Sequence, residues 1–504
     1  MTYTDEVVDA SYGAIPHQSP ILDSKVQIPR EYSVINESVD SNSVELEENK
    51  SLLGNLKLEP EFKPRKSIIR FYILLLFCGF TFMQGLIWNN WGPIADSAEI
   101  VYKWDSGGSV IALLTNLGPI AFVPGFILFP IIMNLFGLRY GILLGMLLTC
   151  IGAVMRIFTT SYPAATIIMY IAHFLNGLAG PASMGASTTI SANWFPYNER
   201  TLATGIGGAS VTLGVAISFI IGPLMVRQVN STNITSTELS EVTTDIYHML
   251  YVLAGVCVIL FLLMLVYYPS KPKYPPSITA EEQRSNFIQT FRQLLTNVSF
   301  WIIFLCYGIA TGVCSAWSGF LYPNLSMLKS IKVTQVYVGW LGFYLTLAGV
   351  TSTIVTGMIS DRLPRWKKSF LITAMVLAGI TALLFTLFCN EMIKVGNMTY
   401  FVITLTGILL KTFVNSTIGI YYELSAELGY PVPEVTSTTV LTLANNLAGF
   451  VFLLLAQFPQ LGTSWMNWCQ AIAFFIVIPL LLFTPIRYNR LNKDIVVKGG
   501  TGLK

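Results

Sequence analysis

The sequence contains little charge and few histidines. Only 11% of its 504 residues are Asp, Glu, Lys or Arg, 53% are hydrophobic, and the mean hydropathy is +0.61. Soluble domains carry about 25% charged residues, so this composition excludes an ordinary soluble fold. The 3 histidines are not arranged as H-E-x-x-H, which excludes that class of zinc enzyme. A membrane protein is therefore expected.

Motifs of catalysis and cofactor binding are also missing. The 7 cysteines stand singly in apolar stretches, so we expect neither a metal centre nor a disulfide framework. The chain has no G-x-x-x-x-G-K-[ST] phosphate loop and no G-x-S-x-G nucleophile turn. The net charge of +3 comes without a basic block, which argues against nucleic acid as a partner. We expect no enzyme, cofactor, metal or nucleic acid.

Long apolar runs recur after residue 66. A bilayer core about 30 Å thick needs about 20 apolar helical residues to cross it. Runs that are apolar on all faces favour helices over barrel strands. The sequence therefore predicts an all-α membrane protein, with twelve spans near residues 68–92, 107–135, 140–160, 165–193, 200–226, 247–268, 299–326, 336–360, 369–389, 399–425, 434–457 and 467–486.

The basic residues predict the orientation. Most Lys and Arg residues fall in loops on the side of the two termini, and cytosolic loops are the ones enriched in these residues. Both termini are therefore expected in the cytosol. The opposite face carries glycosylation sequons in plausible loops, at Asn230, Asn233 and Asn397.

An internal duplication marks two short polar turns. Their shared order of residues is Asn134, Gly137 and Arg139 in the first turn and Gly357, Asp361, Arg362 and Arg365 in the second. The second turn resembles the G-x-x-x-D-R-x-x-R-[KR] motif of the major facilitator superfamily, in which the acid and the following bases latch neighbouring helices. Asn134 cannot form an ion pair, so the first latch should be weaker.

Two pseudo-symmetric six-helix halves of the major facilitator fold follow from this duplication, because Asn134 and Asp361 stand 227 residues apart. The expected organisation is a cytosolic tail over 1–66, an N-terminal half over 67–268, a cytosolic linker over 269–298, a C-terminal half over 299–486 and a cytosolic tail over 487–504. We expect the protein to be a monomer.

Polar and aromatic residues midway along the spans predict a substrate cavity between the halves. Trp88 and Trp317 occupy pseudo-equivalent positions and should form opposing walls. Aromatic faces with amide donors suit a flat, polar, largely uncharged or weakly cationic ring compound. The candidate substrate-binding residues are Trp88, Asn89, Asn90, Trp91, Asn176, Thr212, Trp317, Ser318, Asn445 and Asn446.

Few charged groups stand within the spans. His173 is the readiest proton carrier, although a neutral histidine packed between helices is the commoner arrangement. Glu423 and Glu427 are further candidates, but a structural role as acceptors for the basic loop 362–368 is favoured over proton coupling. Lys411 has no obvious partner in the sequence.

Several motifs together resemble solute carrier family 49 over essentially all of residues 67–497; they are Trp88–Pro93, Leu175–Pro181, Asn193–Phe195, Asn198–Arg200, Trp317–Gly319, Glu423–Glu434, Ser464–Cys469 and Tyr488–Val497. The resemblance implies a lysosomal carrier and, for the nearest member, a proton-coupled exporter of pyridoxine, a vitamin B6 form. Choline- and haem-associated relatives have a glutamine where Thr212 stands, which puts a choline site in doubt. The alternatives are choline or haem transport, or a sensor or receptor that does not transport.

The N-terminal tail carries a sorting motif. Glu48, Leu52 and Leu53 fit the acidic dileucine pattern, in which a carboxylate meets a basic patch and two leucines fill an apolar pocket of a clathrin adaptor. A polar tail with scattered Pro and Gly cannot bury a core and is expected to be disordered. The sequence thus predicts lysosomal sorting through a cytosolic adaptor.

Overall fold

The computed structural model describes residues 67–104, 109–158, 161–227, 234–274, 276, 292, 294–326, 328, 333, 335–456, 464–488 and 490–492. The sorting motif at Glu48, Leu52 and Leu53, the sequons at Asn230 and Asn233, and most of the predicted linker lie outside the described residues.

Helices account for nearly all of the described chain. In the N-terminal half they are α2 (Ile69–Asn89), η2 (Gly92–Ile94), α3 (Ala95–Tyr102), α4 (Ser109–Leu135), α5 (Leu138–Met155), α6 (Ala164–Leu178), α7 (Gly180–Trp194), α8 (Arg200–Met225) and α9 (Ser236–Val266). In the C-terminal half they are α12 (Val298–Tyr307), η3 (Gly308–Gly312), α13 (Val313–Ser318), α14 (Leu321–Ser326), α15 (Gln335–Arg362), η4 (Pro364–Trp366), α16 (Lys367–Cys389), η5 (Gly396–Met398), α17 (Thr399–Asn415), α18 (Ile418–Gly429), α19 (Glu434–Ala456) and α20 (Ser464–Phe483).

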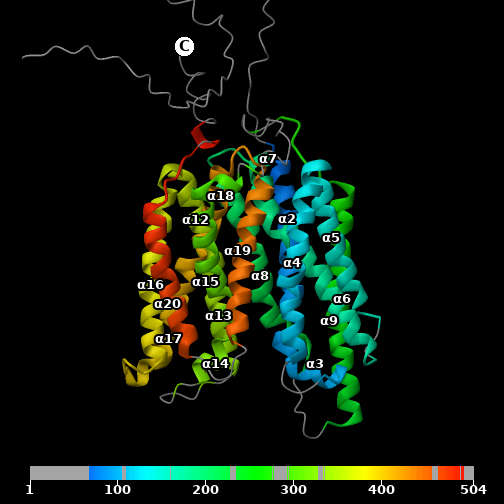
Figure 1. Cartoon of the computed structure of the whole chain (residues 1–504). Coiled ribbons are helices and arrows are strands. Elements are labelled where there is room, and N and C mark those ends of the chain that lie inside the picture. Colours follow the sequence, from blue (N-terminus) through cyan, green and yellow to red (C-terminus); the bar gives the residue numbers. More distant parts are fainter. Residues whose placement is uncertain are drawn as a thin grey trace, which may run out of the picture. The chain divides into compact units, whose positions relative to one another are not determined.

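The prediction of twelve spans in an all-α fold is confirmed. Among the described residues, 12 helical stretches are long and apolar enough to cross a membrane, and each overlaps one predicted span. Three of these stretches are composites of two α-helices: α6 with α7, α12 with α13 through η3, and α17 with α18. Figure 1 shows the long helices running alongside one another.

Two boundaries differ most from the sequence-based expectation. The sixth span begins at Ser236, not near 247, because Thr235 and Glu238 form a capping box that starts α9 inside the predicted loop. The seventh span ends at Ser318, not 326, and the short α14 begins at Leu321. Arg227 pairs with Glu241 and Asp245 on the polar first turns of α9, which stabilises this early helix.

Each half of the bundle has its own apolar core. One core is built from residues 73–268 with Val435, and two others draw on residues 294–488 and 317–466. The halves meet chiefly where α8 packs on α15 and α18, and where α19 packs on α7 and α4. The cavity described next is lined by residues of both halves.

Candidate functional site

A cavity of about 400 Å³ lies between the two halves. Its N-terminal wall comes from α2, α4, α6, α7 and α8, and its C-terminal wall from α12, η3, α13, α14, α15, α17, α18 and α19. A volume of this size lies within the range of small-molecule sites.

Most of the predicted substrate-binding residues line this cavity. They are Trp88, Asn89, Thr212, Trp317, Ser318, Asn445 and Asn446. Asn90, Trp91 and Asn176 are not among the lining residues. Asn176 and Gln84 exchange hydrogen bonds through their side-chain amides and main-chain carbonyls, at 3.1 and 3.3 Å. Trp91 packs edge-on against Tyr102 and Trp104.

Trp88 is held in place by its neighbours in α4. Its indole Nε1 donates a hydrogen bond to the main-chain oxygen of Thr115 at 3.2 Å. The indole lies over Gly118, where a Cβ atom would come within 2.6 Å of Nε1. Glycine at position 118 is therefore what leaves room for the ring at the cavity wall.

Trp317, on the opposite wall, is fully buried and donates from Nε1 to Asn467 Oδ1 at 2.7 Å. Its ring also packs edge-on against Phe385. Trp317 is therefore a packed residue behind the cavity wall, with no exposed ring surface.

A single π-helical turn, η3, interrupts the seventh span beside the cavity. Thr311 donates from Oγ1 to Asn445 Oδ1 at 2.9 Å, and a Cβ at Gly312 would lie 2.5 Å from the main-chain oxygen of Asn445. The turn therefore brings α19 unusually close to the seventh span. Such turns occur frequently at functional sites.

The other two composite spans also break next to the cavity. Gly177 and Gly180 line it at the junction of α6 and α7, and Asn415 and Ile418 line it at the junction of α17 and α18. Discontinuous helices near the midplane are typical of transporter binding sites, because they free main-chain groups to face a substrate.

Lys411 is a lining residue that the sequence-based candidates did not include. It lies on α17, and its Nζ approaches the main-chain oxygen of Cys314 at 3.4 Å. The signal that could have identified it is the presence of a lone lysine within a span, since such residues are costly and usually functional.

His173 lies apart from the cavity lining, in a buried polar cluster. Its Nδ1 is 3.1 Å from Arg156 Nη2, and Arg156 Nη1 donates to Asn90 Oδ1 at 3.2 Å. The guanidinium can donate to Nδ1 only when that nitrogen carries no proton, and an imidazolium would put two cations side by side. The geometry thus favours a neutral, structural His173.

Glu423 and Glu427 meet a residue that the sequence assigned to the C-terminal tail. Arg490 is fully buried and contacts three glutamates: Nη2 lies 2.6 Å from Glu423, Nη1 lies 3.2 Å from Glu434, and Nε lies 3.5 Å from Glu427. Lys367, from the predicted basic loop, is a more distant partner of Glu423 at 3.9 Å. The main ion-pair partner is therefore Arg490, not the loop.

Glu423 also joins the two halves. Its Oε1 accepts hydrogen bonds from Thr204 at 2.8 Å and from Ser191 at 3.4 Å, both in the N-terminal half. Thr188 and Thr438 make another such bond at 2.8 Å. We call the side of the bundle that carries Glu423 and Asp361 the latch face.

The two predicted latches are both engaged across the halves. The Asp361 carboxylate accepts from the main-chain N–H groups of Thr201 and Leu202 at 2.8 and 2.7 Å, at the start of α8. Asn134 donates a single bond to Thr436 Oγ1 at 3.3 Å, near the start of α19. Asp361 thus caps the start of α8, whereas Asn134 only contacts a side chain near the start of α19, the pseudo-equivalent helix of the other half.

The remaining motif residues have different environments. Gly137 has a φ of +96° between α4 and α5, and a Cβ at Gly357 would lie 3.0 Å from Leu202 Cα. The side chain of Arg139 donates to the main-chain oxygen of Leu265 at 3.0 Å. Arg362 and Arg365 are exposed. Asn397, the described sequon, is exposed in η5.

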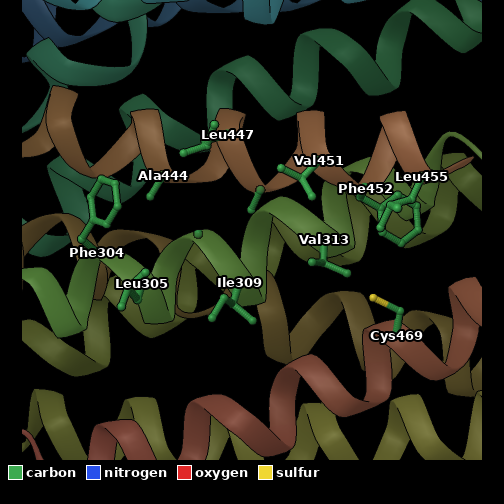
Figure 2. A pocket seen from close by; sticks show the side chains of 12 residues that line it. Phe304, Leu305, Ile309, Val313, Ala444, Leu447, Val451, Phe452, Leu455 and Cys469 are labelled. Atoms are coloured by element: carbon green, nitrogen blue, oxygen red, sulfur yellow. The ribbon is translucent and has the colours of Figure 1, made fainter.

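A second pocket, of about 270 Å³, is apolar and lies between the seventh span and α19. Figure 2 shows Leu305, Ile309 and Val313 on one side and Leu447 and Val451 on the other. Leu305, Leu447 and Val451 are about half exposed at 50%, 55% and 50%, as expected for a surface that faces lipid.

Comparisons of sequence match most of the chain. A profile described as Major Facilitator Superfamily matches residues 73–453. The Solute carrier family 49 member 4 homolog of Xenopus tropicalis is 35% identical over 438 residues, which cover 86% of this chain and 95% of the relative. The Choline/ethanolamine transporter FLVCR2 of Homo sapiens is 24% identical over 396 residues, which cover 76% of this chain and 70% of the relative.

Solved structures show the same fold. The E. coli fucose:proton symporter FucP aligns with a TM-score of 0.61 at 12% identity, covering 83% of this chain and 100% of that one. The proton:xylose symporter XylE aligns with a TM-score of 0.65 at 14% identity, covering 86% and 99%. Identities this low bear on the fold alone.

Proposed function

The chain belongs to solute carrier family 49 within the Major Facilitator Superfamily, and from this membership we propose that it exports pyridoxine from the lysosome with protons by alternating access. The chain is a transporter of this family. The substrate, the proton coupling and the lysosomal location go beyond this membership and are our proposal. The sorting motif in the tail and the cytosolic termini remain predictions on which the location rests.

The observation that carries the substrate proposal is the lining of the central cavity. Trp88 is partly exposed and presents ring surface, and Asn89 and Asn445 add amide groups from the two halves. A hydroxylated pyridine ring could stack on this indole and hydrogen-bond to the amides. Binding at the junction of the halves is what alternating access requires.

We assign proton coupling to Glu423. His173 packs against Arg156, whereas Glu423 both pairs with Arg490 and accepts bonds from the other half. Protonation would neutralise the Glu423 carboxylate and weaken its attraction to Arg490, which would loosen the latch face. Loss of this proton to the cytosol would allow the latch face to close again.

Purified protein in proteoliposomes tests this proposal. Radiolabelled pyridoxine should accumulate on the side of the latch face when the opposite side is acidic. Trp88→Ala should lower uptake about tenfold, which corresponds to a free-energy change of ~1.4 kcal/mol. Glu423→Gln should abolish gradient-driven accumulation but keep exchange of labelled for unlabelled pyridoxine. Unchanged accumulation by Glu423→Gln would remove this residue from the coupling, and absence of pyridoxine uptake by the parent protein would reject the substrate.

Choline or ethanolamine is the second candidate substrate, because FLVCR2 of Homo sapiens, a relative at 24% identity, bears that name. Competition of labelled pyridoxine uptake by excess choline separates the two. Efficient competition would favour the second candidate.

A further inference from the structure

The central cavity carries one positive charge and no negative one among the described residues that line it. Lys411 is the only lining side chain of the Lys, Arg, Asp or Glu type; the other polar lining groups are amides, hydroxyls, indoles and a thiol. The charged glutamates of the latch face do not line the cavity. The electrostatic character of the site is therefore set by Lys411.

The ammonium of Lys411 has little compensation from the protein. Its nearest polar contact is the main-chain oxygen of Cys314, at 3.4 Å, which is at the long end for a hydrogen bond. No carboxylate within the described part of the chain forms a salt bridge with it. A charge at membrane depth without a partner is costly, so such residues commonly serve a ligand.

The surroundings of Lys411 define what such a ligand must look like. Cys314 lies one helical turn before Ser318 on α13, and both residues line the cavity, so the ammonium stands near this wall of the C-terminal half. Asn415 follows Lys411 by one turn on α17 and lines the same cavity. A ring compound bound in the cavity could thus direct an oxygen substituent at Lys411.

We propose that Lys411 is the substrate-selecting charge of the cavity, and that it favours aromatic ring compounds bearing an acidic oxygen over organic cations. The inference rests on the proposed role of this cavity as the substrate site. An ionised ring hydroxyl or carboxylate supplies the missing countercharge, because a lysine ammonium binds oxyanions as a point charge. A quaternary ammonium would instead be repelled by Lys411 in a medium of low dielectric constant.

Nicotinate and nicotinamide form a matched pair of probes, since they share a pyridine ring and differ in the charge of one substituent. Binding to the purified protein is measured by isothermal titration at neutral pH, with choline chloride as the cationic probe. The parent protein should bind nicotinate about tenfold or more tightly than nicotinamide, and choline most weakly.

Two variants assign this preference to Lys411. Lys411→Met should bring the nicotinate-to-nicotinamide ratio close to one and raise choline affinity, whereas Lys411→Arg should keep most of the preference. The inference is overturned if the parent protein binds choline best, or if it binds neither nicotinate nor nicotinamide. This result does not depend on whether a variant folds. An unchanged ratio in folded Lys411→Met overturns it too, and this outcome is independent of whether pyridoxine is transported.

Discussion

At the scale of single residues, the cavity depends on side chains that neighbouring positions must accommodate. Trp88 reaches the cavity wall only because Gly118 has no side chain, and Asn445 approaches the seventh span only because Gly312 has none. These are packing requirements with a direct effect on the binding surface. They make the shape of the site sensitive to single methyl groups.

Gly118→Ala tests this dependence. The added Cβ would collide with Trp88 Nε1, displace the indole and break its bond to Thr115. We expect the KM for the transported solute to rise several-fold with normal expression. Gly342→Ala is the matched control, because Gly342 also lines the cavity and a Cβ there meets nothing within 4 Å. Equal effects of the two substitutions would disprove the specific role of Gly118.

At the scale of helices, the latch face is closed by contacts between helix ends of the two halves. Asp361 binds two N–H groups at the start of α8, where the helix dipole also attracts a carboxylate. Asn134 offers α19 one neutral bond. The two pseudo-equivalent latches therefore differ in strength, and the Asp361 latch should dominate the closed state.

Asp361→Asn should shift the protein toward a state open at the latch face. Loss of charge-assisted bonds typically costs about 1.5–3 kcal/mol. Spin labels at Phe136 and Leu363, exposed residues at the latch-face ends of α4 and α15, should report a longer mean distance, after replacement of the partly exposed Cys78 and Cys469. Asn134→Ala should lengthen it less. The idea fails if the Asn134 variant opens the latch face more than the Asp361 variant.

At the scale of the whole molecule, twelve spans bring residue 67 and residue 490 to the same face of the bundle. The basic loops predict that this latch face is cytosolic. Asn397 lies exposed at the opposite face, between α16 and α17. Its glycosylation would mark that face as lumenal.

Glycosidase digestion of the protein from mammalian cells checks this orientation. Asn397→Gln should remove one glycan-dependent shift in gel mobility. Substitution of Asn230 and Asn233 should also reduce the glycan-dependent shift. Asn297 is the control, since it is also a sequon but caps α12 at the latch face. A mobility shift lost in Asn297→Gln would place the latch face in the lumen and reverse the predicted topology.

The sequence by itself determined the architecture: hydrophobic length predicts the spans, and the repeated turns at Asn134 and Asp361 predict two halves. It also placed Trp88, Trp317 and Asn445 in the cavity, because polar residues deep in a span rarely face lipid. Only the tertiary structure decided which faces of these nearly uniformly apolar helices turn inward, since such helices carry little periodic signal. The orientation of each helix about its own axis therefore decides that Asn90 contacts Arg156 and that Lys411 lines the cavity. Packing of the chain's end likewise brought Arg490 among the glutamates, a contact between distant segments that no local pattern encodes.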